Sequence, residues 1–375
     1  MTVNTIPAQA LARQPRGIVK LGGQAVSGWV SWEVSSNNYY EADTFRVSFA
    51  ASALPVANNA AWFATQKELF VEIFAGFPAN PERINSTDLQ SLIYGRVDDI
   101  SFDPVSTLIT VTGRDLTAAF IDAKLTAAWT NQTSSSIAIA LASSHGLTPV
   151  VTATKTNVGT YYKHDQVRMQ SNRSEWDLLA WIAREEGFVC YVTGNELHFE
   201  PDTVLSADPY VIRWTAPSAP TGYPTANVQE LHFSRSLTVA KGITVTVRSP
   251  STTKKTPVVQ SYPAAAKVVK VGKSAPFGNS QAYFFTIASN KTANDVQAYA
   301  QARYKEIIAH EMKLHARLPG DNLLSTRTLL RVDGTGTAFD QTYFPNVITR
   351  QMSMDEGYTM TVEAKNHNPD TVAAP

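Results

Sequence analysis

Alternation of hydrophobic and polar residues runs through the first hundred positions of the chain. In "DTFRVSFA" (43–50), phenylalanine and valine take every second position, and Arg46 and Ser48 fall between them. A period of two is typical of a strand with one buried and one solvated face. Further strands are predicted in "GWVSWEVSS" (28–36), in "KELFVEIFAGF" (67–77) and, as two or three strands punctuated by Gly95, Asp103-Pro104 and Gly113, in 92–115. Their number and spacing indicate a small barrel or sandwich.

The hydrophobic period becomes helical after Gly113. Asp115 is a capping residue for a helix in 116–125, and "TSSSIAIALASSHGLTP" (133–149) has serine caps in front and Gly146 behind. In "SNRSEWDLLAWIAREEGFVCYVTGNELHFEP" (171–201), Ser174 and Asp177 have the spacing of a capping box. One apolar face, a left-handed stop and a hairpin follow, so residues 113–202 are expected to form a compact α/β insert. The face comprises Trp176, Leu179, Ala180 and Ala183, and the stop is Gly187.

Strand patterns return in the last third of the chain, around one long helix. "KGITVTVRSP" (241–250) alternates again, and a polar, basic loop (251–257) follows it. Thr292 begins a helix, with Asp295 in the capping-box position, that is expected to reach about residue 310. "TRTLLRVDG" (326–334) is expected to be one strand, and the chain then forms a hairpin about Asp355-Glu356-Gly357. A β unit is therefore expected at each end, with helical material between them.

Composition limits the class of protein. The 375 residues are 43% hydrophobic and 17% charged, which is typical of globular chains. Lys plus Arg equals Asp plus Glu, 32 against 32, so no overall basic field attracts nucleic acid or an anionic membrane. Cys190 is the only cysteine, which excludes an intramolecular disulfide and a four-cysteine zinc site, and its apolar surroundings indicate a small buried hydrophobe. We expect no signal peptide and no membrane span.

Motifs for catalysis or metal binding are absent from the sequence. "HEMKLH" places His310 and His315 five apart, which is wrong for a zinc-protease helix, so solvated histidines at a helix end are expected. The adjacent carboxylates Asp98-Asp99 and Glu185-Glu186 are interpreted as solvated charges, because neighbours diverge on a strand and on a helix. "DGTGTAFD" (333–340) is interpreted as a β turn. We therefore predict no catalytic, cofactor-binding or metal-binding residue, and a structural or interaction protein.

Three stretches, in order, resemble one family. "LIYGRVDDISFDPVSTLITVTGRDLTAAFIDA" resembles the end of the first barrel in phage tail baseplate hub proteins, the Mu-type and VgrG-like group. "WDLLAWIAREEGFVCYVTGNELHFEP" is similar to the helix and hairpin of the same proteins. The segment from "TANDVQAYAQARYKEIIAHEMKLHARLPGDN" to "FPNVITRQMSMDEGYTMTVEAKN" is similar to their last helix and second barrel. The resemblance is taken to extend over about residues 20 to 367, and the quoted stretches lie between Leu92 and Asn366.

The resemblance implies a fold and an assembly. The fold class is mainly β with an α/β insert (α+β), and contains two similar, tube-like β-barrel domains plus helix-hairpin domains. Three chains then present six barrels, so a homotrimer joins the sixfold tail tube to the threefold spike and leaves a channel for DNA in transit. Implied partners are a tail tube or distal tail protein, a separate spike protein, and a baseplate wedge or tape-measure protein. The implied location is the tail baseplate of a virion that is assembled in a bacterial cytoplasm. The chain is expected to have no membrane-spanning segment.

The expected division of the chain follows from the patterns and the resemblance together. It comprises an N-terminal arm (1–16), a first β-barrel (17–112), the insert (113–202), connecting strands that form part of the second barrel (203–262), a linker and long helix (263–318), the C-terminal part of the second barrel (319–367) and a tail (368–375).

Five residues are expected to be framework positions that hold this scaffold rigid: Gly95, Gly113, Arg114, Trp176 and Gly187. Two other functions stay open from the residues alone. A carbohydrate-binding tail-tip or adhesin module would use exposed Trp and Tyr in one groove, and a hydrolase would bring a distant nucleophile and base into one cleft.

Overall fold

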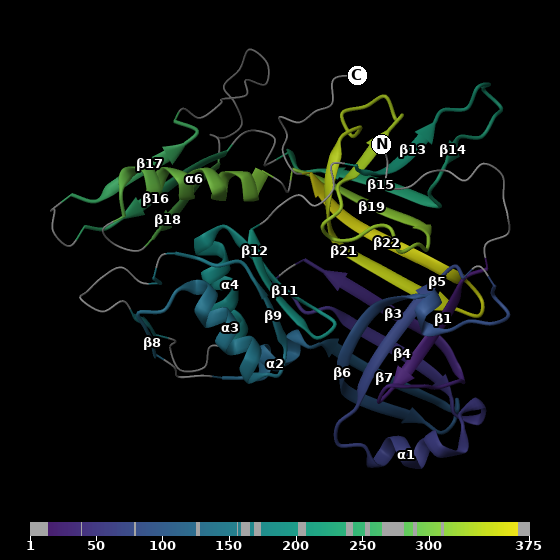
Figure 1. Cartoon of the computed structure of the whole chain (residues 1–375). Helices are drawn as coiled ribbons and strands as arrows, with labels where there is room; N and C mark the ends of the chain where they lie inside the picture. Colours follow the sequence, from purple (N-terminus) through teal and green to yellow (C-terminus); the bar gives the residue numbers. More distant parts are fainter. Residues whose placement is uncertain are drawn as a thin grey trace.

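Four units make up the fold in the computed structural model (Figure 1). Residues 14–115 form the N-terminal β unit, and residues 208–237 with 311–366 form the C-terminal β unit. Residues 116–201 form the helical insert, and residues 243–308 form the α6 unit. The structure describes residues 14–38, 40–78, 80–124, 128–155, 157–158, 166–168, 174–201, 208–237, 243–251, 256–264, 281–287, 291–308 and 311–366. Most of the expected arm and the expected tail lie outside these residues.

The N-terminal β unit is an antiparallel sheet in the order β3-β4-β7-β6-β5-β1-β2. The alternating side chains of 43–50 are buried as predicted, and the short helix α1 (Ala60–Thr65) adds Phe63 to the same core. Residues 92–115 contribute two strands, and Gly95 and Gly113 lie inside them, so their prediction as breaks was wrong. The strands are β1 (Arg16–Leu21), β2 (Gln24–Ala25), β3 (Trp29–Asn37), β4 (Thr44–Ala50), β5 (Phe70–Gly76), β6 (Gln90–Asp103) and β7 (Leu108–Asp115).

The C-terminal β unit repeats this strand order. Its sheet runs β14-β13-β20-β21-β22-β19-β15, antiparallel except for the parallel pair β13–β20. The predicted hairpin about Gly357 is confirmed, whereas "TRTLLRVDG" forms a strand only over its residues 330–333. The strands are β13 (Tyr210–Thr215), β14 (Thr225–Ala226), β15 (Glu230–Arg235), β19 (Met312–Pro319), β20 (Leu330–Asp333), β21 (Thr342–Ser353) and β22 (Gly357–Asn366).

The two β units share one 14-stranded sheet, because β21 also pairs with β3. Met352 and Tyr358 of the C-terminal unit pack into the core of the N-terminal unit, where the ring of Tyr358 lies 5.8 Å from that of Trp32. The protein is mainly β, in agreement with the sequence. Among the described strands neither unit closes into a barrel, since the two end strands of each sheet do not pair with each other.

The helical insert packs α2 (Thr117–Asp122), α3 (Ser134–Ser144) and α4 (Glu175–Glu186) on a small sheet. The capping box of Ser174 and Asp177 is confirmed, and Gly187 ends α4 with φ of 70°. The N-cap positions of two helices differ by one residue from the prediction. Leu116, and not Asp115, directly precedes α2, and Thr133, and not a serine, caps α3. The sheet comprises β9 (Thr148–Val151), β11 (Phe188–Thr193) and β12 (Glu196–Pro201), and β8 (Ala128–Thr130) pairs separately with β10 (Gln166–Arg168).

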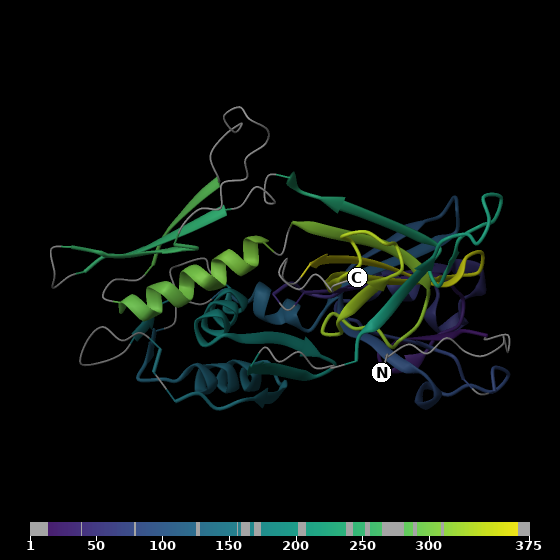
Figure 2. The same cartoon turned by 90° about the horizontal axis from the view of Figure 1, so that it is seen from above.

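The α6 unit branches from the C-terminal β unit between β15 and β19 (Figure 2). Its strands β16 (Ile243–Ser249), β17 (Val258–Tyr262) and β18 (Gln281–Thr286) form a separate sheet against α6 (Ala293–Ile308). The helix reaches Ile308, the last described residue before the predicted end at about residue 310. His315 lies on the exposed side of β19, so its prediction as an end-of-helix residue was wrong, and His310 lies outside the described residues. None of the described helices is long and apolar enough to cross a membrane.

Candidate functional site

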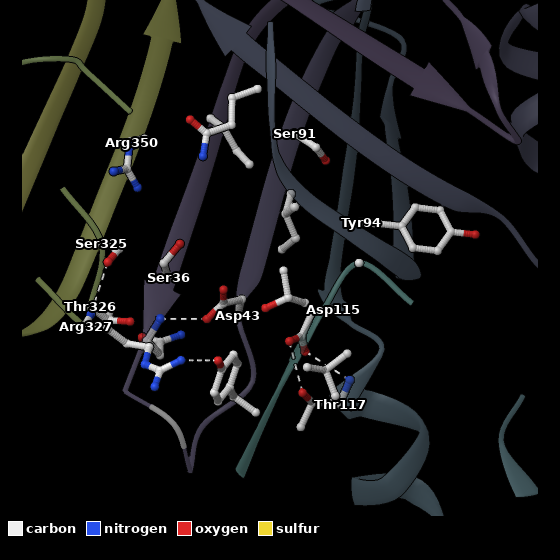
Figure 3. Close-up of a pocket in the computed structure, with 18 of the residues that line it drawn as sticks. Ser36, Asp43, Ser91, Tyr94, Asp115, Thr117, Ser325, Thr326, Arg327 and Arg350 are labelled. Carbon is white, nitrogen blue, oxygen red and sulfur yellow. Dashed lines mark hydrogen bonds between the residues drawn. The ribbon is translucent and has the colours of Figure 1, made fainter. Parts of the chain in front are cut away.

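The two β units and the helical insert meet around a cavity of about 410 Å³ (Figure 3). One wall comes from the β3–β4 connection and from β6 and β7, and a second comes from the β11–β12 turn. The third wall comes from the loop before β20 and from β21. The charged residues that line it include Asp43, Asp115, Arg327 and Arg350. The cavity therefore marks the point where three units of one chain are held together.

Two carboxylates from the N-terminal β unit lie side by side at this junction, Asp43 before β4 and Asp115 at the end of β7. The backbone N–H of Asp115 donates to the carbonyl of Asp43 at 2.9 Å, and Asn37 N–H donates to the Asp43 carboxylate at 2.7 Å. Burial raises the pKa of Asp43 to about 7, although Arg350 opposes the shift. Burial, together with the charge of Asp43, raises the pKa of Asp115 well above its usual range.

Arg350 organises the opposite wall. Its side chain is 6% exposed, at an inward-facing position of β21. Its Nε donates to the carbonyl of Asp321 at 2.8 Å, and a second guanidinium nitrogen donates to the carbonyl of Leu324. A buried guanidinium needs such acceptors, because an unpaired buried charge is strongly destabilising. Arg350 therefore ties the loop before β20 to the strand that joins the two β units.

Arg327 links the C-terminal β unit to the insert. It forms an ion pair of 2.7 Å with Glu200 on β12 and donates to the hydroxyl of Tyr191 on β11. The Tyr191 hydroxyl also donates to Glu200 at 2.7 Å, and the tyrosine ring stacks on His198 with centroids 4.6 Å apart. The arginine side chain is only 10% exposed, so the pair is shielded from solvent. This cluster fixes the β11–β12 hairpin against the loop before β20.

The β3–β4 connection docks on the insert through two aromatic residues. Trp176 of α4 donates its indole N–H to the carbonyl of Tyr40 at 2.9 Å, and the hydroxyl of Tyr40 donates to the carbonyl of Phe188 at 3.0 Å. The guanidinium of Arg184 lies 4.4 Å from the centre of the Tyr40 ring. Helix α4 and the β11–β12 hairpin thus form the surface of the insert against which the N-terminal β unit packs.

Two of the three predicted framework glycines, Gly95 and Gly113, lie on the neighbouring strands β6 and β7. An added Cβ at Gly113 would lie 2.1 Å from the carbonyl oxygen of Arg96 and 2.6 Å from Cζ of Phe45. At Gly95 it would lie 2.2 Å from the carbonyl oxygen of Arg114 and 3.0 Å from Cε1 of Phe45. The two glycines therefore leave the space that the Phe45 ring fills.

Arg114, the third predicted framework residue, has charged neighbours on both sides. Its guanidinium bonds the carboxylate of Asp98 at 2.6 Å and lies 3.3 Å from that of Asp122 on α2. These contacts join the β6–β7 ladder to the helical insert and raise the pKa of Arg114. The framework role of the five residues nevertheless remains a prediction, because it concerns their effect on stability.

Three of the four adjacent carboxylates have polar or charged neighbours in addition to solvent. Asp98, which lies at a bulge between Val97 and Asp99, forms an ion pair with Arg114 on the neighbouring strand. Glu186 accepts a hydrogen bond of 2.7 Å from the Ser134 hydroxyl, and Glu185 lies 3.9 Å from Lys291. Asp98, Asp99 and Glu185 are exposed, as the interpretation as solvated charges requires, whereas Glu186 is half-buried. The carboxylates are part of contacts between elements.

The cavity lining shows what chemistry the junction offers. No histidine or cysteine occurs among the residues that line it. Across the described part of the chain, no group of three or more His, Cys, Asp or Glu side chains is placed to hold a metal ion. Arg327 and Asn322 of the lining bond across unit boundaries, to the insert and to the N-terminal β unit, whereas Asn37 and Arg350 bond within their own unit. Both kinds of contact suit a rigid joint. Sequence reasoning missed Asp43, Arg327 and Arg350, although a charged residue at an inward strand position was an available signal for Arg350.

Known structures with a similar fold include tail proteins. A tail protein from Neisseria meningitidis is similar over 96% of this chain and 99% of its own, with a TM-score of 0.67 and 14% sequence identity. The fold is that of a phage tail protein. The 43 kDa tail protein of prophage MuSo2 from Shewanella oneidensis is similar over 95% of this chain and 99% of its own, with a TM-score of 0.64 and 16% identity.

A secretion-system protein shares the tail-protein fold. A component of the Escherichia coli type VI secretion system, described as similar to tail proteins of bacteriophage T4, matches 95% of this chain and 79% of its own. Its TM-score is 0.50 and its sequence identity is 12%. The sequence matches no protein-family model and no curated protein. At these identities the likeness defines the fold of the chain and not its activity.

Proposed function

We propose that this protein is a structural baseplate hub of a phage tail or of a tail-like injection machine. The observation that carries the proposal is the likeness to tail proteins over nearly the whole length of both chains, together with two β units of the same strand order. The resemblance of the three sequence stretches to hub proteins points in the same direction. The protein acts as scaffold, and the contacts around the junction cavity supply the rigidity that a scaffold needs.

The hub forms as a homotrimer. Three chains carry six β units, which complete a tube-like ring with approximate sixfold symmetry. One face of the ring seats a tail tube or distal tail protein, and the threefold face holds a separate spike protein. Baseplate wedge or tape-measure proteins contact its outside or its lumen. DNA crosses the lumen in transit, and the equal numbers of basic and acidic residues suit a passage to which DNA does not adhere.

The surface favours this role over carbohydrate binding. Large aromatic residues that are well exposed in the described part of the chain are dispersed over different units, as Tyr223 in the C-terminal β unit, Phe284 in the α6 unit and Trp181 on α4 show. A carbohydrate groove gathers such rings on one concave surface. We therefore assign the protein a structural function without an enzymatic step.

Native mass spectrometry and negative-stain imaging of the purified chain test the proposal. A particle of three 40.9 kDa chains with six lobes around a lumen is the expected result. Particles purified from the producing bacterium, with an affinity tag on this chain, should carry three copies at the junction of tube and spike. Absence of the tagged chain from intact tails would overturn the proposed function.

A further inference from the structure

The two β units have the same order of strands, although β13 runs parallel to β20 whereas β1 runs antiparallel to β5. In the common order, β3, β4, β7, β6, β5, β1 and β2 match β15, β19, β22, β21, β20, β13 and β14. The register matches as well, because β6 has a bulge between Val97 and Asp99 opposite β7, and β21 has one between Pro345 and Val347 opposite β22. When the two bulges are superposed, Asp99 of β6 is equivalent to Val347 of β21. The remaining pairings then place β3 on β15, with Ser35 on Ser234.

The contact between the units within one chain uses two of these strands. Beyond its short pairing with β20, the far half of β21 pairs with β3, from Val347 opposite Asn37 to Ser353 opposite Ser31. The contact is well packed, since Met352 is 5% exposed. It also contains a hydroxyl pair, because the side chains of Ser35 and Thr349 lie 3.0 Å apart. Strand β6 corresponds to β21, and β15 corresponds to β3.

The corresponding surfaces of β6 and β15 have no partner strand in the described part of the chain. One edge of β6 pairs with β5 over Gln90–Arg96. Farther along the same edge of β6, residues 99–103 have no partner strand. Phe102 is 50% exposed there, whereas Arg350 at the matching position of β21 is 6% exposed. β15 pairs with β19 on one side alone. The two open edges belong to different β units of the molecule (Figure 1).

We infer that β15 of one copy pairs antiparallel with the far half of β6 of a second copy, in the register that β3 and β21 use within the chain. Transfer of the register places Asp99 opposite Ser236, Ile100 opposite Arg235, Ser101 opposite Ser234, Phe102 opposite Phe233 and Asp103 opposite His232. The inference deepens the proposed function and rests on it for closure of the ring at three copies.

Side-chain chemistry along the two edges is complementary in this register. The hydroxyls of Ser101 and Ser234 take the places of Thr349 and Ser35, so the hydroxyl pair is repeated. Phe102 meets Phe233, which covers the exposed ring, and Asp103 meets His232, which is favourable when the histidine is protonated. Pairing also satisfies backbone N–H and C=O groups that an open edge leaves unpaired.

A groove beside the open half of β6 offers space for side chains of the incoming strand. It has a volume of about 350 Å³ and lies between α1 and β6. Its lining includes Phe63, Leu69, Ile100 and Phe102. The contact uses different surfaces on the two copies, so it repeats head to tail and closes into a ring when the rotation per copy allows it.

Cysteine cross-linking tests the register directly. Residues directly opposite on antiparallel strands have Cβ atoms about 4.5–5.5 Å apart, close enough for a disulfide after small adjustments. The double variant Ser101→Cys with Ser234→Cys should, on mild oxidation, form covalent dimers and trimers that reducing agent dissolves. The background is low, because Cys190 is the only native cysteine and is fully buried. Ser35→Cys with Thr349→Cys is the positive control, and should cross-link within one chain.

The register-shifted pair Ser101→Cys with Arg235→Cys is the matched negative control, because neighbouring residues on a strand point to opposite faces. It should remain uncross-linked between chains. Intermolecular bonds in the 101–234 variant and not in the 101–235 variant support the contact. Equal yields in both variants, or none in the 101–234 variant at any protein concentration, overturn it.

A charge placed on the open edge gives a second readout without cysteine. Phe102→Asp should weaken self-association by roughly tenfold or more, because a carboxylate would be buried against Phe233. Val105→Asp, in the turn beyond the paired stretch and at a position 93% exposed, should leave association unchanged. If both variants assemble like the unmodified protein, the contact is wrong. The proposed function is judged separately, by the mass of the unmodified chain and by its presence in intact tails.

Discussion

The hydroxyl of Ser35 lies 3.0 Å from that of Thr349, although 314 positions separate the two residues. This pair belongs to the ladder that joins β3 to β21, and through this ladder the two β units share one sheet. The helical insert and the α6 unit are placed between these strands in sequence but to one side of them in space (Figure 1). The two β units therefore form one continuous sheet, and the helical insert and the α6 unit lie beside it.

Gly113→Ala should destabilise the protein. The new methyl group would lie 2.1 Å from the carbonyl oxygen of Arg96 and would press on the ring of Phe45, so the β6–β7 ladder or the ring must shift. Overpacking of this kind costs about 1–3 kcal/mol. Urea unfolding, read at the midpoint with its slope, measures the loss, and Thr110→Ala on the same strand is the control. Equal midpoints for Gly113→Ala and the unmodified protein would contradict the proposed close approach.

Gly187→Val should lower the melting temperature, and Gly187→Asn should lower it much less. Gly187 has φ of 70°, and nothing lies within 4 Å of an added Cβ, so the cost comes from the backbone conformation and not from a collision. A left-handed conformation costs an ordinary residue about 1–2 kcal/mol, whereas asparagine tolerates it better. Differential scanning calorimetry measures both variants. Similar melting temperatures for valine and asparagine would show that this turn is not held left-handed.

Ionisation of Asp43 should lower the stability of the folded protein as the pH rises from about 4 to about 7. The pKa of Asp43 is raised to about 7 in the folded protein, against about 3.9 for an unfolded chain. Between these two pKa values the folded state binds more protons than the unfolded state, so stability falls as the pH rises. The stabilising contribution of protonated Asp43 is fully present below the unfolded pKa. Asp115, raised in the same direction by burial and by Asp43, adds to the slope, and Arg350 opposes it.

Asp43→Asn is the variant that isolates this effect. Asparagine keeps an acceptor for Asn37 N–H but cannot ionise, so the fall in stability across this pH range should become smaller. Denaturant unfolding at a series of pH values measures the slope. Asp99→Asn, at an exposed carboxylate on β6, is the control and should leave the slope unchanged. A slope as steep in Asp43→Asn as in the unmodified protein would assign the titration to another group.

Cys190 should react slowly with thiol reagents while the protein is folded. The side chain is fully buried in the core of the helical insert, and burial raises the pKa of its thiol. Labelling with a chromogenic disulfide reagent should be complete in denaturant and much slower in buffer. Fast labelling of the folded protein would show that the insert opens readily, and would remove the clean background that the cross-linking experiment uses.

Local patterns were sufficient for the elements whose signals are short-range. The capping box of Ser174 and Asp177 and the left-handed Gly187 were predicted because each depends on residues within one turn of the helix. Alternation along β4 and β22 likewise identified the buried faces, since side chains on a strand point to opposite sides in turn. Where predictions failed, as for Gly95 and Gly113 inside strands, the cause was a distant ring that fills the space of the missing side chains.

The sequence by itself determined many of the helices and strands, the mainly β class and the presence of a β unit at each end. Tertiary structure decided which strands lie beside each other, because strand pairing joins residues hundreds of positions apart and the pattern of period two is satisfied by many pairings. It also decided that Asp43, Asp115 and Arg350 share one cavity, since no pattern within a single segment connects the three residues. The pairing of β3 with β21, and the open edges that correspond to it, follow from three-dimensional packing alone.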